Sequence, residues 1–388
     1  MRTAFGIIAG IYLWNDVHAS SESQLDLSVV GHDSRHVFKY RWADMSSRDR
    51  RPTLLGRFPN RDVSTLYSFI IDTGTSVSLI RSHHKHRRES PQSVPGLRMV
   101  ESVEGFNIGV NDQLIEDDGE LAFGEEHSER RIADTGKVLV NLEFVDDRTG
   151  SRFDFDTSIY LTQEEHQYPT SGIIAASRAS DFSRRTSKFV LIPEKGEIVL
   201  GDSNESDYSD KFCGSAPFFH ADLEPSTEHD FWTIRGGVRV GQGESHDVEW
   251  TIDTGAGADG TQYIPESAYT ELLELIERTG ATVSEHEPGY KRAIHNCNEE
   301  TQALFPTISI SVFNKHGEVM SVDIGPKEYI QRMPPYYDSV CFLNVVPSRN
   351  QWSSSTNAYL LGLGFLDRMV TIFDNEAEQI SFCTICIA

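Results

Sequence analysis

The sequence has little positive charge. Its 388 residues include 35 lysines and arginines against 59 aspartates and glutamates, which gives a formal net charge of −24 at pH 7. Because nucleic acids and anionic membranes repel an acidic surface, this balance argues against both as partners. The one basic cluster, residues 83–88, is short and lacks interleaved aromatic residues. We interpret it as a solvated loop, with a processing site or an anion patch as the alternatives.

Long hydrophobic runs are also lacking. Beyond the first residues, no stretch has the roughly 18 consecutive apolar residues of a membrane-spanning helix, so we expect no membrane span. The first residues resemble a targeting segment, since Arg2 precedes an apolar run at 4–14 and the small residue Ala19 follows. This pattern predicts a signal peptide at residues 1–19, with a buried first strand or helix as the alternative. We therefore expect a secreted, extracellular protein, with delivery to a vacuole as a variant.

Cysteines are few, and their number, five, is odd. Cys297 and Cys341 flank a segment of strand-like pattern and are candidates to close a loop in an oxidising compartment. Cys213 stands alone, and the sequence leaves open whether it pairs with Cys383 or Cys386. A zinc site needs a second pair of ligands, and none occurs at suitable spacing. We expect no metal and no cofactor.

Short apolar segments and the length of the chain indicate two lobes built mostly of strands. A chain of 388 residues is too long for one ordinary core, and two domains are the natural expectation. From Thr65 onward, apolar or alternating runs are broken by Gly, Asp, Asn and Pro. One segment, 265–278, has helical spacing of its apolar residues and is followed by Gly280. We predict an N-terminal lobe at 65–205 and a C-terminal lobe at 206–388, joined through the turn-rich stretch 201–210.

Residues 20–64 are polar and irregular, with strand-like pieces at 27–30 and 36–42, and we interpret them as a short pro-segment or an N-terminal extension. The strands expected after it are 66–71, 77–80, 120–123, 137–145, 158–161, 189–192, 197–200, 231–240, 249–252, 307–313, 359–361, 370–373 and 379–382.

One short sequence motif occurs once in each half of the chain. An apolar run leads into a single carboxylate, then Thr and Gly, at Ile71-Asp72-Thr73-Gly74 and again at Ile252-Asp253-Thr254-Gly255. This pattern, a strand that ends in a single Asp, occurs twice and predicts two similar lobes that each supply one carboxylate. A third copy, Asp134-Thr135-Gly136, has no buried strand before it. We interpret that copy as a hairpin turn, because Asp and Gly are turn residues.

Two carboxylates at a lobe interface suit the hydrolysis of amide bonds. Two neighbouring carboxyl groups do not both ionise readily, because their like charges repel, so the pair shares one proton. The ionised carboxylate takes a proton from water, and the protonated one polarises the scissile carbonyl. The Gly permits a tight turn, and the Thr hydroxyl is able to bond across to the other lobe. Glycosidases also use paired carboxylates, but they have no need of matching Thr-Gly neighbours.

With these residues the chain resembles the pepsin-like aspartic endopeptidases, two-lobed all-β enzymes with one Asp-Thr-Gly in each lobe. The segments 359–374, 172–175 and 231–234 look like the family's C-terminal Leu-Gly segment, its first-lobe counterpart and the strand that opens the second lobe. The resemblance implies a bilobal all-β fold with an active-site cleft between the lobes. It also implies polypeptide substrates and no cofactor, and we expect a monomer.

The resemblance carries over to particular residues. It implies that Asp72 and Asp253 are catalytic and that Cys297 and Cys341 form the second-lobe disulfide. The positions implied to contact substrate are Gly74, Thr75, Gly255, Ala256, Phe123 and Gly124.

The sequence departs from the family at three of its motif positions. Phe123-Gly124 is the best match to the flap, where the family has Tyr before Gly, so the hydroxyl is lost. Ala256 stands where the family has Ser or Thr, and Leu363 replaces an Asp. Our leading hypothesis is a secreted, acid-active aspartic endopeptidase. The alternative is a catalytically weak or inactive protein on the same scaffold, acting as a peptide-binding or inhibitor module.

Overall fold

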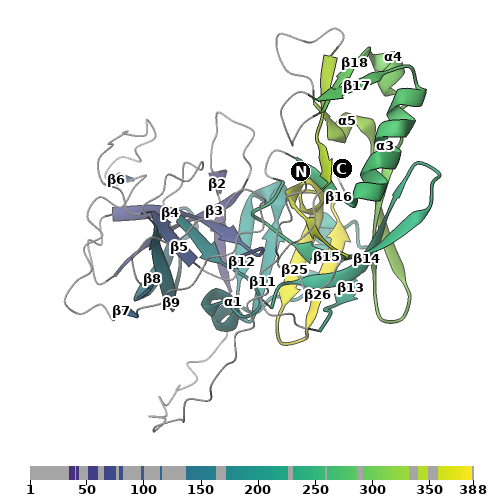
Figure 1. Ribbon diagram of the computed structural model, residues 1–388. Helices are drawn as coiled ribbons and strands as arrows, with labels where there is room; N and C mark the ends of the chain where they lie inside the picture. The colour runs from purple at the N-terminus through teal and green to yellow at the C-terminus, as the bar shows by residue number, and fades with distance from the viewer. Residues whose placement is uncertain are drawn as a thin grey trace, which may run out of the picture. The chain divides into compact units, whose positions relative to one another are not determined.

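The computed structural model shows a protein built mainly of β-strands (Figure 1). It describes residues 35–39, 41–42, 51–59, 65–75, 78–81, 98–99, 114–115, 137–162, 172–225, 230–257, 260–285, 292–331, 340–347 and 357–386. The predicted signal peptide, the third Asp-Thr-Gly at 134–136 and the flap residues Phe123 and Gly124 lie outside these residues. Within them, strands far outnumber helices, which confirms the all-β prediction.

The first sheet gathers the strands around the first Asp-Thr-Gly. Among the described residues it has nine strands in the order β2-β3-β4-β10-β5-β9-β8-β7, with β6 paired to β4. Its strands are β2 (Arg41–Trp42), β3 (Pro52–Arg57), β4 (Thr65–Asp72), β5 (Ser78–Arg81), β6 (Arg98–Met99), β7 (Leu114–Ile115), β8 (Lys137–Asp146), β9 (Ser151–Thr162) and β10 (Gly172–Ala175). In β9, residues 153, 155, 157 and 159 are buried and those between them are more exposed, so this strand has one face on the core.

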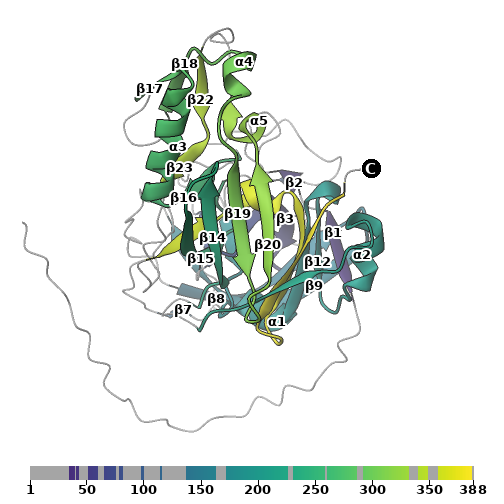
Figure 2. The ribbon, with the colours of Figure 1, turned by 90° about the vertical axis from the view of Figure 1, so that its right-hand side faces the viewer.

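The second half of the chain repeats this plan around the second Asp-Thr-Gly. The described residues form a five-stranded sheet in the order β20-β19-β14-β15-β24, of which β20, β19, β14 and β15 are labelled side by side in Figure 2. They are β14 (Thr233–Val240), β15 (Ser245–Ile252), β19 (Ile308–Phe313), β20 (Val319–Ile324) and β24 (Ala358–Leu361). Strand β15 runs parallel to β24, as β4 runs parallel to β10 in the first half. The two halves therefore share one local design.

Two small sheets and the main helix complete the second half. The sheets pair β16 (Gln262–Ile264) with β23 (Val345–Pro347), and β17 (Thr282–Glu285) with β18 (Arg292–His295), β22 (Val340–Leu343) and β21 (Ile330–Gln331). Helix α3 (Glu266–Arg278) contacts β14, β17 and β23. It buries Leu272 and Ile276, and Gly280 beyond its end has a positive φ of 91°. The helix predicted from apolar spacing at 265–278 is confirmed.

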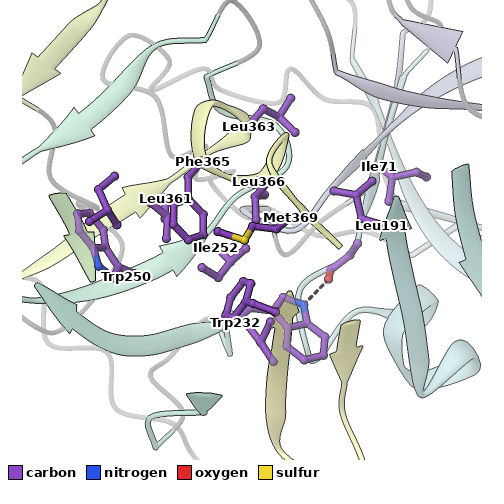
Figure 3. Packing of buried hydrophobic residues seen from close by; sticks show 14 of the residues in the cluster. Ile71, Leu191, Trp232, Trp250, Ile252, Leu361, Leu363, Phe365, Leu366 and Met369 are labelled. Carbon is purple, nitrogen blue, oxygen red and sulfur yellow. Dashed lines mark hydrogen bonds between the residues drawn. The ribbon is translucent and has the colours of Figure 1, made fainter. Parts of the chain in front are cut away.

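A six-stranded sheet combines strands from both ends of the described chain. Its order is β1-β12-β11-β25-β26-β13, formed by β1 (His36–Lys39), β11 (Lys188–Ile192), β12 (Glu197–Leu200), β13 (Phe219–Asp222), β25 (Met369–Asp374) and β26 (Gln379–Thr384). Phe189 of β11 stacks on Phe373 of β25 with ring centroids 4.4 Å apart, and Trp232 packs edge-on against both rings. The Trp232 indole donates to the carbonyl of Ala176 (2.7 Å; Figure 3). This sheet joins the two halves of the sequence.

The remaining helices are short. They are α1 (Asp181–Thr186), the 3-10 turn η1 (Pro193–Lys195), α2 (Ser206–Phe212), α4 (Glu299–Gln302), α5 (Pro326–Tyr329) and α6 (Leu363–Leu366). Helix α2 begins inside the stretch 201–210, which we expected to be turn-rich, and ends two residues beyond it. Tyr208 and Phe212, four residues apart, are buried in a small apolar cluster and give α2 its buried face. Among the described helices, none is long and apolar enough to cross a membrane.

The structure settles the cysteine pairing that the sequence left open. Cys213, at the end of α2, is bonded to Cys383 of β26, and Cys386 is a free, exposed thiol. Cys297 is bonded to Cys341 of β22, which is the disulfide that the family resemblance implies.

Asp146, at the end of β8, ties β1 to the β8–β9 hairpin. Its carboxylate accepts hydrogen bonds from the backbone N–H of Lys39 (2.6 Å) and from the N–H (2.9 Å) and guanidinium Nε (3.1 Å) of Arg148. Burial raises the pKa of Asp146, but these hydrogen bonds outweigh it and leave the pKa below its ordinary value. The fold therefore favours the ionised carboxylate.

We predict that Asp146→Asn destabilises the fold by about 1–2 kcal/mol at pH 7, since an amide replaces a charged acceptor of several hydrogen bonds. Because the folded-state pKa lies below the unfolded value, this contribution is present above about pH 4 and is lost as the pH falls through the folded-state pKa. Urea denaturation should therefore show a smaller difference from the wild type at pH 3 than at pH 7. The exposed Asp154→Asn serves as control and should change stability little. An equal Asp146→Asn deficit at both pH values would contradict the assignment.

Candidate active site

The two Asp-Thr-Gly turns begin where two equivalent strands end. Asp72 is the last residue of β4, and Asp253 follows β15 directly. The neighbouring parallel strand fixes each of them, because the N–H of Ala176 donates to the carbonyl of Asp72 (2.7 Å) and the N–H of Asp253 donates to the carbonyl of Leu361 (3.1 Å). Each half of the chain thus holds one aspartate at the end of a buried parallel pair of strands.

Two threonines join the turns reciprocally. The N–H of Thr73 donates to Thr254 Oγ1 (3.1 Å), and the N–H of Thr254 donates to Thr73 Oγ1 (2.9 Å). Each hydroxyl in turn donates across to the other strand, Thr73 to the carbonyl of Ile252 (2.8 Å) and Thr254 to that of Ile71 (2.6 Å). Both threonines are buried. The two turns are therefore braced into one unit whose halves have the same geometry.

Backbone N–H groups hold both carboxylates. Asp72 Oδ1 accepts from the N–H of Gly74 (2.8 Å), and Asp253 Oδ1 accepts from the N–H of Gly255 (2.7 Å) and of Ala256 (3.1 Å). Asp253 is 5% exposed, whereas Asp72 is only partly buried. Replacement of the family's Ser or Thr by Ala256 thus leaves Asp253 with two backbone donors.

The two glycines bring the carboxylates together. A Cβ added to Gly74 would collide with the carboxylate of Asp253, and one added to Gly255 would collide with that of Asp72. Each glycine thus donates to its own aspartate and has the opposite aspartate against its Cα. This close approach explains why the position after each Thr is glycine. Each carboxylate therefore lies against the glycine of the opposite turn, which brings the two negative groups together.

Ala256 packs tightly against the segment that opens α6. The N–H of Leu363 donates to the carbonyl of Ala256 (2.9 Å), and a Cβ on Gly362 would lie 2.6 Å from that carbonyl oxygen. Leu363, in place of the family's Asp, is buried in the apolar cluster that also holds Ile252 (Figure 3). Gly257 leaves the turn with a positive φ of 68°. The family departures at 256 and 363 are therefore accommodated by close apolar packing.

The structure brings most of the predicted site residues together and leaves others elsewhere. Gly74, Thr75, Gly255 and Ala256 lie in the two turns beside the carboxylates, and Thr75 is buried. The predicted flap residues Phe123 and Gly124 fall outside the described part of the chain. The disulfide between Cys297 and Cys341 joins the segment between β18 and α4 to β22 and does not involve the Asp-Thr-Gly turns.

Sequence reasoning missed one residue at this site, Arg51. It directly precedes β3, is 8% exposed, and its guanidinium Nε donates to the carbonyl of Gly255 (2.7 Å). No motif singles out Arg51. The available signal was the register between two strands, which becomes visible only once β3 and β4 are paired.

Comparison with known families agrees with this geometry. The family model of eukaryotic aspartyl proteases matches residues 186–385, more than half of the chain, so the chain belongs to this family. The match includes the second Asp-Thr-Gly and all four disulfide-bonded cysteines, and it begins after the first Asp-Thr-Gly. A comparison with curated proteins finds no match. The resemblance stated from the motifs is confirmed.

We predict that Thr73→Val and Thr254→Val each destabilise the fold by about 3 kcal/mol, because each removes a hydroxyl that donates and accepts across the turns and leaves buried polar groups unpaired. Thermal or urea unfolding measures the effect.

A matched control is Thr371→Val in β25, whose buried hydroxyl has no hydrogen-bond partner among the described residues. This substitution should cost almost nothing or should stabilise the fold. Equal losses for Thr371→Val and Thr73→Val would show that the cross-turn hydrogen bonds contribute nothing specific.

Proposed function

We propose that the protein is an aspartic endopeptidase that hydrolyses peptide bonds in polypeptides with a water molecule activated between Asp72 and Asp253. The observation that supports this most is the reciprocal placement of each carboxylate against the glycine of the other turn. Membership of the aspartyl protease family supports a peptidase, and the paired geometry supports the two aspartates as its catalytic groups.

The chemistry follows from two carboxylates that are too close to ionise independently. Such a pair holds one proton over a wide range of pH, and that proton belongs to the pair rather than to either residue. The ionised group removes a proton from the water as the water oxygen bonds to the scissile carbonyl carbon, and the protonated group donates to the carbonyl oxygen. The resulting tetrahedral diol then breaks its C–N bond as the nitrogen receives a proton from the pair. A hydroxyl of the diol gives its proton to the other carboxylate as the carbonyl re-forms, which restores the single shared proton.

Backbone donors supply the electrostatic support for these steps. The N–H groups of Gly74, Gly255 and Ala256 stabilise negative charge on the two carboxylates and fix their orientation without side-chain motion. Gly74, Thr75, Gly255 and Ala256 are the residues we assign to substrate contact in the two turns, and we assign Phe123-Gly124 to the flap motif. The substrate is a polypeptide, and the working form is a monomer with lobes at 65–205 and 206–388.

An acidic working environment fits the composition. A net charge of −24 at neutral pH implies strong self-repulsion, which eases when part of the 59 carboxylates is protonated. The two disulfides fit an oxidising compartment, either outside the cell or in a vacuole. We therefore assign secretion through the segment at residues 1–19 and activity below neutral pH.

The test is cleavage of a denatured protein at acidic pH, with and without pepstatin. Wild-type protein should cleave it in a pepstatin-sensitive manner, and Asp72→Asn and Asp253→Asn should each abolish cleavage while leaving the fold intact by circular dichroism.

Asp134→Asn, in the third Asp-Thr-Gly, is the matched control and should remain active. Full activity of either Asp72→Asn or Asp253→Asn would refute the catalytic assignment. Tight binding of peptides by the wild type without turnover would instead identify an inactive peptide-binding protein on the same scaffold.

A further inference from the structure

A buried cation lies beside the paired turns. Arg51 is 8% exposed, and arginine remains protonated at every pH at which a protein stays folded. A buried charge is costly unless groups of opposite charge or good acceptors surround it. The position of Arg51 in the fold identifies those groups.

Strand register places Arg51 at the level of the first catalytic aspartate. In the antiparallel pair of β3 and β4, Thr53 lies opposite Ile70. The recorded pairs end at Thr53 and Ile70, and the same register continued two residues beyond them would put Arg51, just outside β3, level with Asp72. Residues that lie opposite each other on antiparallel strands have Cα atoms about 4.5–5.5 Å apart and point to the same face.

A second contact reaches the other turn. The guanidinium Nε of Arg51 donates to the carbonyl of Gly255, the residue whose Cα faces the Asp72 carboxylate. Arg51 thus spans from the end of β4 to the turn after β15. A planar guanidinium is suited to such bridging, because its five donors are fixed in one fork.

The charges around Arg51 are unevenly distributed. Its guanidinium is bonded to the carbonyl of Gly255, the residue against which the Asp72 carboxylate lies, and Asp253 belongs to the same turn as Gly255. The other charged residues on strands paired with β3 are Arg41 of β2, at the register position opposite Thr53, and Lys137, Glu143 and Asp146 of β8. Glu143 pairs with Arg57 at the far end of β3, and Asp146 is bonded to Lys39 and Arg148. The charge of Arg51 therefore acts mainly on the aspartate pair.

We propose that Arg51 is a positioning residue that sets the pH range of the aspartate pair. Its charge stabilises the ionised forms of both carboxylates and moves the whole activity profile to lower pH, while its hydrogen bond holds the Gly255 turn in place. This inference rests on the proposed function, since it concerns the same two aspartates. It adds a residue from before β3 to a site otherwise built by the two Asp-Thr-Gly turns.

The pH profile of kcat/KM in Arg51→Met and Arg51→Lys tests the proposal. Loss of the cation in Arg51→Met should move both limbs of the bell-shaped profile upward by about one pH unit, because ionisation of each carboxylate becomes harder. Arg51→Lys keeps the charge and should keep both limbs within a few tenths of a unit of the wild type, with a lower maximum. Arg57→Met, which removes a cation from the same strand, should leave the limbs in place.

Unchanged limbs in Arg51→Met would overturn the proposal and reduce Arg51 to a structural residue. Equal shifts in Arg51→Lys and Arg51→Met would also overturn it, since geometry rather than charge would then be responsible. If the wild-type protein itself does not cleave the denatured substrate, the proposed function is rejected instead. In that case proton uptake, measured by titrating folded wild type against Arg51→Met, still tests the charge effect, and identical curves would reject it.

Discussion

The site depends on the reciprocal hydrogen bonds between the Thr73 and Thr254 turns. Each threonine donates its N–H to the other's hydroxyl, and each hydroxyl donates to the carbonyl before the opposite aspartate. These bonds are buried, where leaving a polar group unpaired is expensive, so the turns have one favourable arrangement. Because the hydrogen-bonded residues flank the aspartates directly, fixing the threonines also fixes the carboxylates.

The surrounding sheets make that bracing possible. Parallel partners hold the ends of β4 and β15, and the six-stranded sheet combines strands from the two halves. The stacked rings of Phe189 and Phe373, with Trp232 edge-on, form part of its packing. A site made of two halves needs their relative position fixed within a fraction of an ångström. The buried aromatic packing and the cross-turn hydrogen bonds meet that need together.

Much of this arrangement is readable from the sequence because it is local. Apolar runs predict about half of the described strands, including those at 66–71 and 249–252, and helical spacing predicts α3. The repeated Asp-Thr-Gly after an apolar strand identifies Asp72 and Asp253, and the third copy shows that the tripeptide alone is a weak signal. The strand expected at 231–240 begins at Thr233, and the two residues before it, Phe231 and Trp232, are buried in the core.

Features that depend on pairing between residues far apart in the chain could not be predicted from the sequence. The bond from Cys213 to Cys383 depends on α2 packing against β26, and neither spacing nor composition distinguishes Cys383 from Cys386. Strand β3 lies within residues 20–64, where the polar sequence has weak periodicity, and its partner strands stabilise it. Strands β1 and β2, by contrast, fall on the strand-like piece expected at 36–42. Arg51 belongs to the same class, because its place beside the aspartates follows only from the pairing of β3 with β4.

The central claim is that the two braced turns force Asp72 and Asp253 to share one proton. Potentiometric titration of the wild type, with the curve of the Asp72→Asn/Asp253→Asn double variant subtracted, measures that proton without any substrate. We expect two release steps separated by more than about two pH units, with one proton retained between them. Release of both protons together near the ordinary carboxyl value of about 4 would show that the carboxylates titrate independently, which contradicts the paired site.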